Sequence, residues 1–215
     1  MSKSIGVIGS GQVGQALALG FVKHGYSVML GSNNPEKRKE LSESLSGVTV
    51  GTFAEAAAFG SLLVLAVKGS NAIDALNSAG LHNFSGKVVL DANNPIEQVP
   101  PVDGVIQYFT QQNHSLMEQL QSAAPSAHFV KAFSCVGAPF MVNPDFGGIQ
   151  PTMFICGNDT TAKTKATGIL HQFGWEVEDL GTVSAAGAIE SLAILWCIPG
   201  FRENRWVHAF KLLKG

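Results

Sequence analysis

Six residues near the N-terminus, Gly9-Ser10-Gly11-Gln12-Val13-Gly14, form a G-x-G-x-x-G pattern. Each glycine has a physical use: Gly9 permits a tight turn, Gly11 lets a diphosphate approach the backbone, and Gly14 lets a helix lie close to a strand. The N–H groups that open such a helix attract anions. Between a strand and a helix the pattern predicts dinucleotide binding, and a purely structural turn is the alternative.

The segment Gly31-Ser32-Asn33-Asn34 indicates which dinucleotide is favoured, because NAD sites usually carry an Asp or Glu at the end of their second strand. This segment has no carboxylate that would repel a 2′-phosphate. Ser32, Asn33 and Asn34 offer polar groups, and Lys37, ahead of Arg38, lies one turn into the next predicted helix. We therefore expect NADP rather than NAD, although Lys37 could equally belong to a solvated helix face.

Three later segments carry small or polar residues where predicted strands end, which is where open parallel sheets bind ligands. We expect them to contact the nicotinamide half of the cofactor. The candidates are Ala66, Val67, Lys68, Asn93, Asn94, Pro95, Ser134, Val136 and Gly137. Asn93 and Asn94 are explained equally well as turn formers before Pro95.

No residue is assigned a catalytic role. Cys135 has no evident base beside it in the sequence and is interpreted as an inert small residue. The six histidines form no H-x-H or H-x-x-x-H pair, so no metal site is predicted. A carbonyl substrate would need a proton donor, whereas hydride transfer to a flavin-type ring mainly needs alignment. The sequence thus favours a flavin-type acceptor.

The composition is that of a core-rich globular chain. Of the 215 residues 46% are apolar and 14% charged, and 24 are glycine. This excludes intrinsic disorder, and the net charge of −2 gives no support for a nucleic-acid or membrane-surface partner. Three separated cysteines and no leader-like segment predict a cytoplasmic protein. The longest apolar runs, 62–67 and 192–198, are too short to span a bilayer.

Short apolar runs alternate with helical periods, which predicts a doubly wound, mostly parallel sheet with helices on both faces, an α/β fold of the Rossmann type. The predicted strands are 4–8, 27–31, 48–51, 62–67, 87–91, 128–132, 152–156 and 175–180. The predicted helices are 12–24, one from 34, 53–59, 70–79, 115–123, 159–173, 185–196 and 203–213. We expect one domain over 1–215, with the helices of 182–215 as a dimer contact or a lid.

Four C-terminal aromatic residues are expected to pack in the core rather than form a dimer surface: Trp196, Phe201, Trp206 and Phe210. A homodimer remains an alternative that the sequence leaves open.

Beyond the glycine pattern, several segments together resemble the coenzyme F420-dependent NADP oxidoreductase family. They are 17–21, 31–32, 35–37, 130–133, 136–138, 154–159, 177–181 and 190–192. The same module resembles the reductase domain of the six-transmembrane metalloreductases. The resemblance implies NADP(H) bound by the glycine turn and by a Ser-Arg pair after the second strand, with the acceptor ring near the loop after the sixth. Ser32 matches the Ser of that pair, but Asn33 occupies the position where Arg is usual. In a later motif, Ser134 occupies the position where Asn is usual.

The expected function is an NADP(H)-dependent oxidoreductase that passes hydride between NADP(H) and F420, FMN, FAD or another small redox acceptor. One alternative is a protein that senses NADP(H) without turnover. Another is a dehydrogenase of the hydroxyisobutyrate or pyrroline-carboxylate reductase type, although those carry a larger helical second domain.

Overall fold

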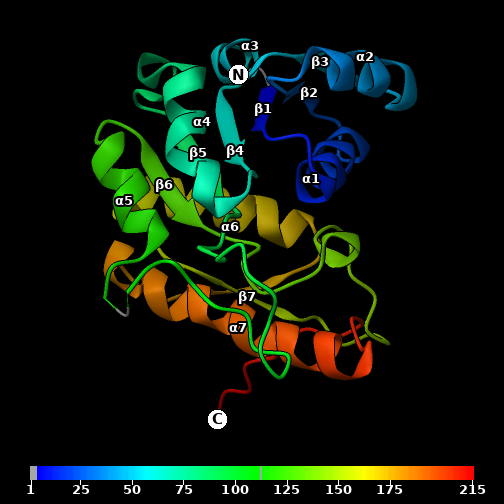
Figure 1. Ribbon diagram of the computed structural model, residues 1–215, viewed down its shortest axis with the longest axis vertical. Coiled ribbons are helices and arrows are strands. Elements are labelled where there is room, and N and C mark those ends of the chain that lie inside the picture. Colours follow the sequence, from blue (N-terminus) through cyan, green and yellow to red (C-terminus); the bar gives the residue numbers. More distant parts are fainter. Residues whose placement is uncertain (1–3, 112) are drawn as a thin grey trace.

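A six-stranded parallel sheet in the order β3-β2-β1-β4-β5-β6 forms the centre of the computed structural model, which describes residues 4–111 and 113–215 (Figure 1). The chain crosses over after β3, so the strand order reverses between β1 and β4. This confirms the predicted Rossmann-type doubly wound fold. The strands are β1 (Ser4–Ile8), β2 (Ser27–Gly31), β3 (Val48–Gly51), β4 (Leu62–Leu65), β5 (Val88–Asp91) and β6 (His128–Lys131).

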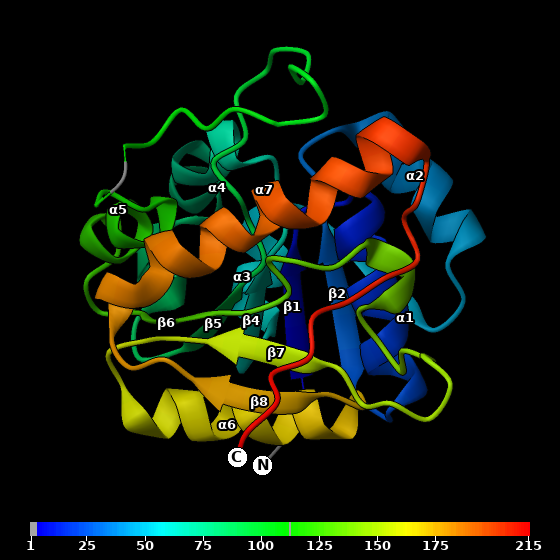
Figure 2. The same cartoon turned by 90° about the horizontal axis from the view of Figure 1, so that it is seen from below.

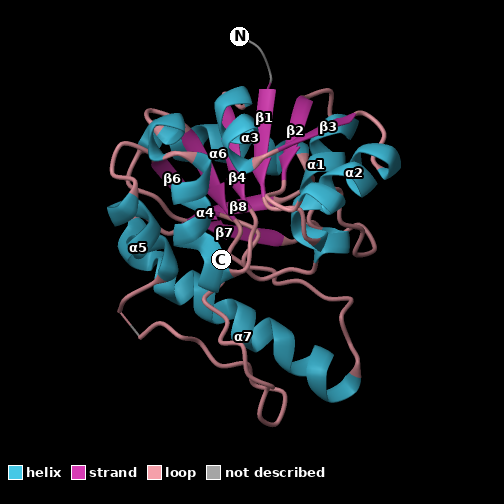
Figure 3. Cartoon of the chain, turned by 45° about the horizontal axis from the view of Figure 1, so that its top comes forward, coloured by secondary structure: helices cyan, strands magenta, loops and turns pink. Residues whose placement is uncertain are grey.

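Helices cover both faces of this sheet (Figure 3). One face carries α1, α2 and α6, and the other carries α3, α4 and α5. The helices are α1 (Gln12–Lys23), α2 (Pro35–Ser44), α3 (Phe53–Phe59), α4 (Ala72–Ala79), α5 (Leu116–Ala123), α6 (Thr160–Gln172) and α7 (Ala186–Glu203). Short 3-10 turns are η1 (Gly69–Asn71), η2 (Leu81–Phe84), η3 (Ala138–Phe140) and η4 (Val183–Ala185).

Local sequence explains where several helices begin. Asn34 caps α2, accepting a hydrogen bond from the Lys37 N–H, and Pro35 occupies the first turn. Thr52 and Ser115 each form a reciprocal capping box, at the starts of α3 and α5. These caps account for the agreement between predicted and observed helix starts.

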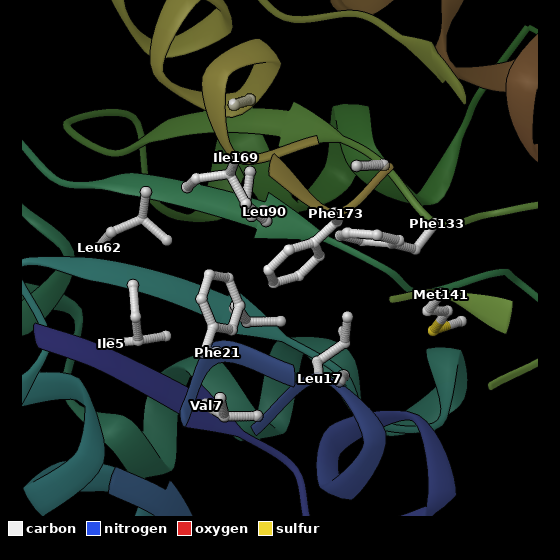
Figure 4. Close-up of a cluster of buried hydrophobic side chains, with 14 of the residues drawn as sticks. Ile5, Val7, Leu17, Phe21, Leu62, Leu90, Phe133, Met141, Ile169 and Phe173 are labelled. Carbon is white, nitrogen blue, oxygen red and sulfur yellow. The ribbon is translucent and has the colours of Figure 1, made fainter. Parts of the chain in front are cut away.

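The central strands are apolar on both faces because helices bury both. In β1, Ile5 and Val7 pack in one core cluster while Ile8 packs in the other. Figure 4 shows the first cluster, in which Phe21 of α1 faces Phe173 at the end of α6. Their ring centroids are 4.8 Å apart.

The last two strands do not extend the main sheet, which corrects the expectation of one continuous sheet. β7 (Thr152–Ile155) and β8 (Glu176–Asp179) pair in parallel as a separate two-stranded sheet. It meets the main sheet through an antiparallel bridge between Lys131 and Cys156. Between β7 and β8, α6 packs on the same face of the main sheet as α1.

The predicted end of a helix at residue 196 and the predicted helix 203–213 are both wrong. α7 continues through Pro199 to Glu203 and ends at Asn204, which adopts left-handed φ of 52°. The Trp206 ring packs where a Gly200 side chain would lie, 2.2 Å from the expected Cβ position, and supports that final turn. Residues 204–215 form an extended tail instead, and the Phe210 carbonyl accepts a hydrogen bond from the Thr152 N–H of β7.

α7 lies across the carboxyl end of the main sheet (Figures 1 and 2). With the preceding 3-10 turn, α7 forms a helical stretch of 21 residues over Val183–Glu203. An 18-residue part of this stretch has a mean hydropathy of 1.5 and is 33% buried. This stretch is long and apolar enough to cross a bilayer. The sequence did not predict this, because its longest apolar run in this region, 192–198, is shorter. Core helices of globular proteins also reach this length and hydropathy.

The C-terminal aromatic residues pack mainly against one another. Trp196 and Trp206 have ring centroids 5.6 Å apart, and Trp206 contacts Phe201 edge-on at 5.2 Å. Trp196 also stacks on His208. Trp196 is 8% exposed and Phe201 48% exposed, so the cluster is an intramolecular one with an open edge.

Candidate functional site

The glycine turn joins β1 directly to α1, as the pattern requires. Gly11 is the N-cap of α1, and no side chain caps that helix end. The first N–H groups of α1 are therefore available to an anion. A Cβ on Gly11 would meet no protein atom within 4 Å, so protein packing does not require glycine here, and the open space fits a diphosphate.

The other two glycines of the pattern are fixed by packing. Gly9 has φ of +120°, and a Cβ there would lie 2.2 Å from the Ala66 carbonyl oxygen. A Cβ on Gly14 would lie 1.8 Å from the Gly9 carbonyl oxygen. These two residues hold the turn tightly against β1 and the end of β4, while Gly11 faces outward.

A guanidinium reaches the end of β2 from α2. Arg38 Nη1 donates a hydrogen bond of 2.9 Å to the backbone oxygen of Ser32. Asn33 Oδ1 instead accepts from the Phe53 N–H at 3.4 Å, and Asn34 is engaged in capping α2. Arg38, which the sequence ranked behind Lys37, thus supplies cationic charge where Asn33 replaces the usual Arg.

A cavity of about 400 Å³ opens beside this strand end. Its lining residues are Asn33, Phe53, Val67, Asn71, Asp74, Ala75 and Ser78. An apolar wall with a few polar groups suits a planar heterocycle. Sequence reasoning missed Phe53, Asn71 and Asp74, because they lie on elements that the glycine pattern does not include.

Two adjoining cavities continue from the glycine turn along the sheet edge. One, of about 290 Å³, is lined by Gly11, Gln12, Val13, Ala66, Val67, Lys68 and Ala92. The other, of about 360 Å³, is lined by Val13, Val67, Lys68, Gly69, Ser70, Ala92, Asn93, Asn94, Ile96, Glu97 and Gln98. Together with the cavity at β2 they form a cleft over the carboxyl ends of β1, β2, β4 and β5, which we call the edge cleft.

The asparagines after β5 are structural ties as well as cleft residues. Asn93 is 1% exposed, and its Oδ1 accepts from the Val67 N–H at 2.9 Å. Asn94 and Ser134 form two hydrogen bonds with each other. Asn94 Nδ2 donates to the Ser134 carbonyl oxygen at 2.7 Å, and Ser134 Oγ donates to Asn94 Oδ1 at 2.9 Å. Residues 92–95 form no turn, so the asparagines line the cleft and tie neighbouring segments together.

The loop after β6 begins on a conformation that side chains rarely adopt. Phe133 is 1% exposed and has φ of 60°, a left-handed conformation of a kind that clusters at functional sites. Ser134 and Val136 are buried, and a Cβ on Gly137 would lie 3.1 Å from the Trp196 ring of α7. This loop is therefore packed between the cleft and α7.

A buried ion cluster lies beneath the end of the edge cleft that Asn93 and Asn94 line. Lys131, fully buried at the end of β6, donates from Nζ to Asp91 Oδ2 at 2.8 Å, Glu190 Oε1 at 2.9 Å and the Asn93 carbonyl at 2.6 Å. Glu190 also accepts from the N–H groups of Leu116 and Met117, which open α5.

Charge and burial act in opposite directions on this lysine. Burial alone lowers the pKa of Lys131, but the Asp91 and Glu190 carboxylates outweigh it and hold that pKa above its ordinary value. The ammonium form therefore persists at neutral pH. Sequence reasoning assigned no role to these residues, although a lysine at the end of an apolar strand signals a buried anionic partner.

All three cysteines are free thiols. Burial raises the pKa of Cys135 to about 12, that of Cys156 to about 12, and that of Cys197 to about 11. The thiolate is the nucleophile, so Cys135 is unsuited to nucleophilic catalysis at neutral pH. Within residues 4–111 and 113–215, no group of three or more His, Cys, Asp or Glu is arranged to hold a metal ion.

The predicted site residues divide into three groups. Gly11, Gln12, Val13, Ala66, Val67, Lys68, Asn33, Asn93 and Asn94 line the edge cleft. Gly9, Ser10, Gly14, Ser32, Ser134, Val136 and Gly137 are buried or packed around it. Asn34 and Lys37 lie at the start of α2, and Pro95 follows Asn94 in the loop after β5.

Comparisons with known proteins agree with this geometry. The family model described as "NADP oxidoreductase coenzyme F420-dependent" matches residues 4–95. A crystal structure from Arthrobacter sp. FB24, provisionally assigned as an F420-dependent NADP reductase, is 29% identical, has a TM-score of 0.91 and is covered in full, as is this chain.

The metalloreductase STEAP3 of Rattus norvegicus is 28% identical over 200 residues, which are 91% of this chain and 38% of that protein. The metalloreductase STEAP2 of Homo sapiens is 26% identical over 89% of this chain. The chain thus spans less than two-fifths of the length of these curated relatives. The resemblance predicted from the sequence is confirmed: residues 4–95 match the model of the coenzyme F420-dependent NADP oxidoreductase family, and the whole chain is similar in structure to the Arthrobacter protein.

Proposed function

We propose that this chain binds NADP(H) along the edge cleft and transfers hydride between its nicotinamide and a flavin-type or other small redox acceptor. The observation that carries the proposal is the open position at Gly11, where the free N–H groups of α1 face a cleft that continues in both directions. A dinucleotide has its diphosphate between two extended halves and matches this arrangement.

The β2 end supports NADP(H) over NAD(H). The segment 31–34 carries no carboxylate, and the Arg38 guanidinium lies at hydrogen-bond distance from the Ser32 backbone. A guanidinium pairs well with phosphate oxygens because both present several bonding atoms in a fixed geometry. We infer that Ser32 and Arg38 hold the 2′-phosphate, with Asn33 and Phe53 beside the adenine.

NADPH supplies the hydride, and the protein positions and shields it. Asn93 and Asn94 border the nicotinamide side of the cleft, and Val13 and Val67 give it an apolar wall. Within the described lining of that cavity, Lys68 and Glu97 are the ionisable side chains. This inventory suits an acceptor ring such as F420, FMN or FAD, which needs alignment more than a placed general acid.

The test is oxidation of NADPH, followed by absorbance, with F420, FMN, FAD, a quinone and a ferric chelate offered in turn. We expect turnover with at least one isoalloxazine or deazaflavin. The ferric chelate is included because the curated relatives are named metalloreductases. Tight NADPH binding with turnover of none of the five would instead favour a protein that senses NADP(H).

A further inference from the structure

Lys131 uses its whole hydrogen-bonding capacity inside the protein. An ammonium has three N–H donors, and Nζ meets three acceptors, on Asp91, Glu190 and the backbone of Asn93. Both the lysine and Asp91 are 0% exposed. No proton remains to be offered to a ligand, so Lys131 can act on the edge cleft only through its partners.

Those partners connect four elements. Asp91 ends β5, and its Oδ1 accepts from both the backbone and side-chain nitrogens of Asn93, at 3.0 and 2.8 Å. Asn93 in turn receives the Val67 N–H that follows β4. Glu190 belongs to α7 and binds the first N–H groups of α5. A single ammonium thus fixes the loop 91–95 relative to three neighbouring elements.

Stability alone does not explain such a cluster. Buried ion pairs can often be replaced by well-packed apolar side chains without loss of stability, and in some proteins such polar groups instead fix one arrangement of the chain. Leu116 and Met117, whose N–H groups bind Glu190, belong to a buried apolar cluster. The ion cluster holds Asn93 and the adjacent Asn94 in place, and both residues line the proposed nicotinamide side of the edge cleft.

We propose that Lys131 is a positioning residue: it sets the loop over residues 91–95, and with it the nicotinamide half of the cofactor, and it ties that loop to α7. The inference rests on the proposed binding of NADP(H) in the edge cleft. It assigns Lys131 no contact with the adenosine half, because Ser32 and Arg38 lie at the far side of β1 in the strand order.

The test compares binding of NADPH with binding of 2′,5′-ADP, which carries only the adenosine half, by calorimetry. Lys131→Met should weaken NADPH at least tenfold while 2′,5′-ADP changes less than twofold. Glu190→Gln keeps the shape of the side chain and one acceptor oxygen for α5. It replaces the other oxygen with an NH2 group and removes the charge facing Lys131, so it should weaken NADPH at least threefold with the same selectivity. If Lys131→Met does not fold, Glu190→Gln decides the matter.

Lys163→Met is the matched control. Lys163 also pairs with a carboxylate, Asp179 at 2.9 Å, and with a backbone carbonyl, that of Gly181 at 3.0 Å, but it lies on α6 outside the cleft lining. This variant should leave both affinities unchanged. Equal losses for NADPH and 2′,5′-ADP in the Lys131 and Glu190 variants, or no loss for either ligand, would overturn the positioning role.

The wild type separates the two proposals. If it binds NADPH but oxidises it with no acceptor, the proposed hydride transfer fails while the binding comparison still tests Lys131. If it binds 2′,5′-ADP and NADPH with equal affinity, the nicotinamide half makes no net contribution and the positioning role is contradicted.

Discussion

Arg38 on α2 and Ser32 at the end of β2 are joined by a hydrogen bond of 2.9 Å, from Nη1 to the backbone oxygen. The bond brings a guanidinium from the following helix to the strand end, where the neighbouring position is occupied by the neutral Asn33. In the proposed complex, the positive charge that distinguishes NADP(H) from NAD(H) therefore comes from α2.

The first prediction concerns this guanidinium. Arg38→Ala should weaken NADPH binding by about 1.5–3 kcal/mol, the usual scale of a hydrogen bond to a charged group, and leave NADH binding nearly unchanged. Lys39→Ala is the control, since Lys39 is an exposed neighbour on the same helix. Fluorescence titration with both nucleotides measures the difference. A loss that is equal for NADH would place Arg38 away from the 2′-phosphate.

Asn33 can be tested in the opposite direction. Its Oδ1 makes only a long contact of 3.4 Å to the Phe53 N–H, so Asn33→Arg should free the position and add a phosphate ligand. We expect NADPH to bind more tightly by about 1–3 kcal/mol. In an Arg38→Ala background the same change should recover most of the lost affinity. No gain in either background would mean that position 33 does not face the phosphate.

Gly11 and Gly14 form a matched pair. Gly11→Val should abolish dinucleotide binding without unfolding, because its Cβ would meet no protein atom within 4 Å. Gly14→Ala should instead lower the free energy of unfolding by about 1–3 kcal/mol, since its Cβ would lie 1.8 Å from a backbone oxygen. Thermal melts and nucleotide titration together measure both effects. NADPH binding retained by Gly11→Val would locate the diphosphate elsewhere.

The cysteine pKa values predict thiol reactivity and a pH dependence. At pH 8 the native protein should react slowly with DTNB at Cys135 and Cys156, and all three thiols should react after unfolding. Because the folded protein holds these thiols protonated with pKa values of about 11–12, against 9.0 ordinarily, stability should fall as pH rises from about 9 toward 12. Rapid native modification of Cys135 would contradict its burial.

Much of the fold could be predicted because local and global signals agree. The caps at Asn34, Thr52 and Ser115, and the apolar strands between them, place most elements within about two residues of their observed bounds. The sequence could not predict the tail, because Glu203–Leu213 has a helical composition while its backbone bonds to β7. The separate pairing of β7 and β8 likewise depends on long-range contacts.

The candidate site shows the same division. The glycine turn and the strand ends follow from chain order, and sequence reasoning found nine of the 20 residues that line the three cavities of the edge cleft. The role of Arg38 depends on the rotation of α2, and the cluster of Lys131, Asp91 and Glu190 joins residues that are distant in the sequence. Such contacts become visible only when the elements are packed together.

The most direct test of the central claim is the affinity of the wild-type protein for NADPH and NADH, measured by isothermal titration under the same salt and pH. The proposed site predicts that NADPH binds at least tenfold more tightly. NADH binding that is equal or tighter, or no binding of either nucleotide, would contradict it.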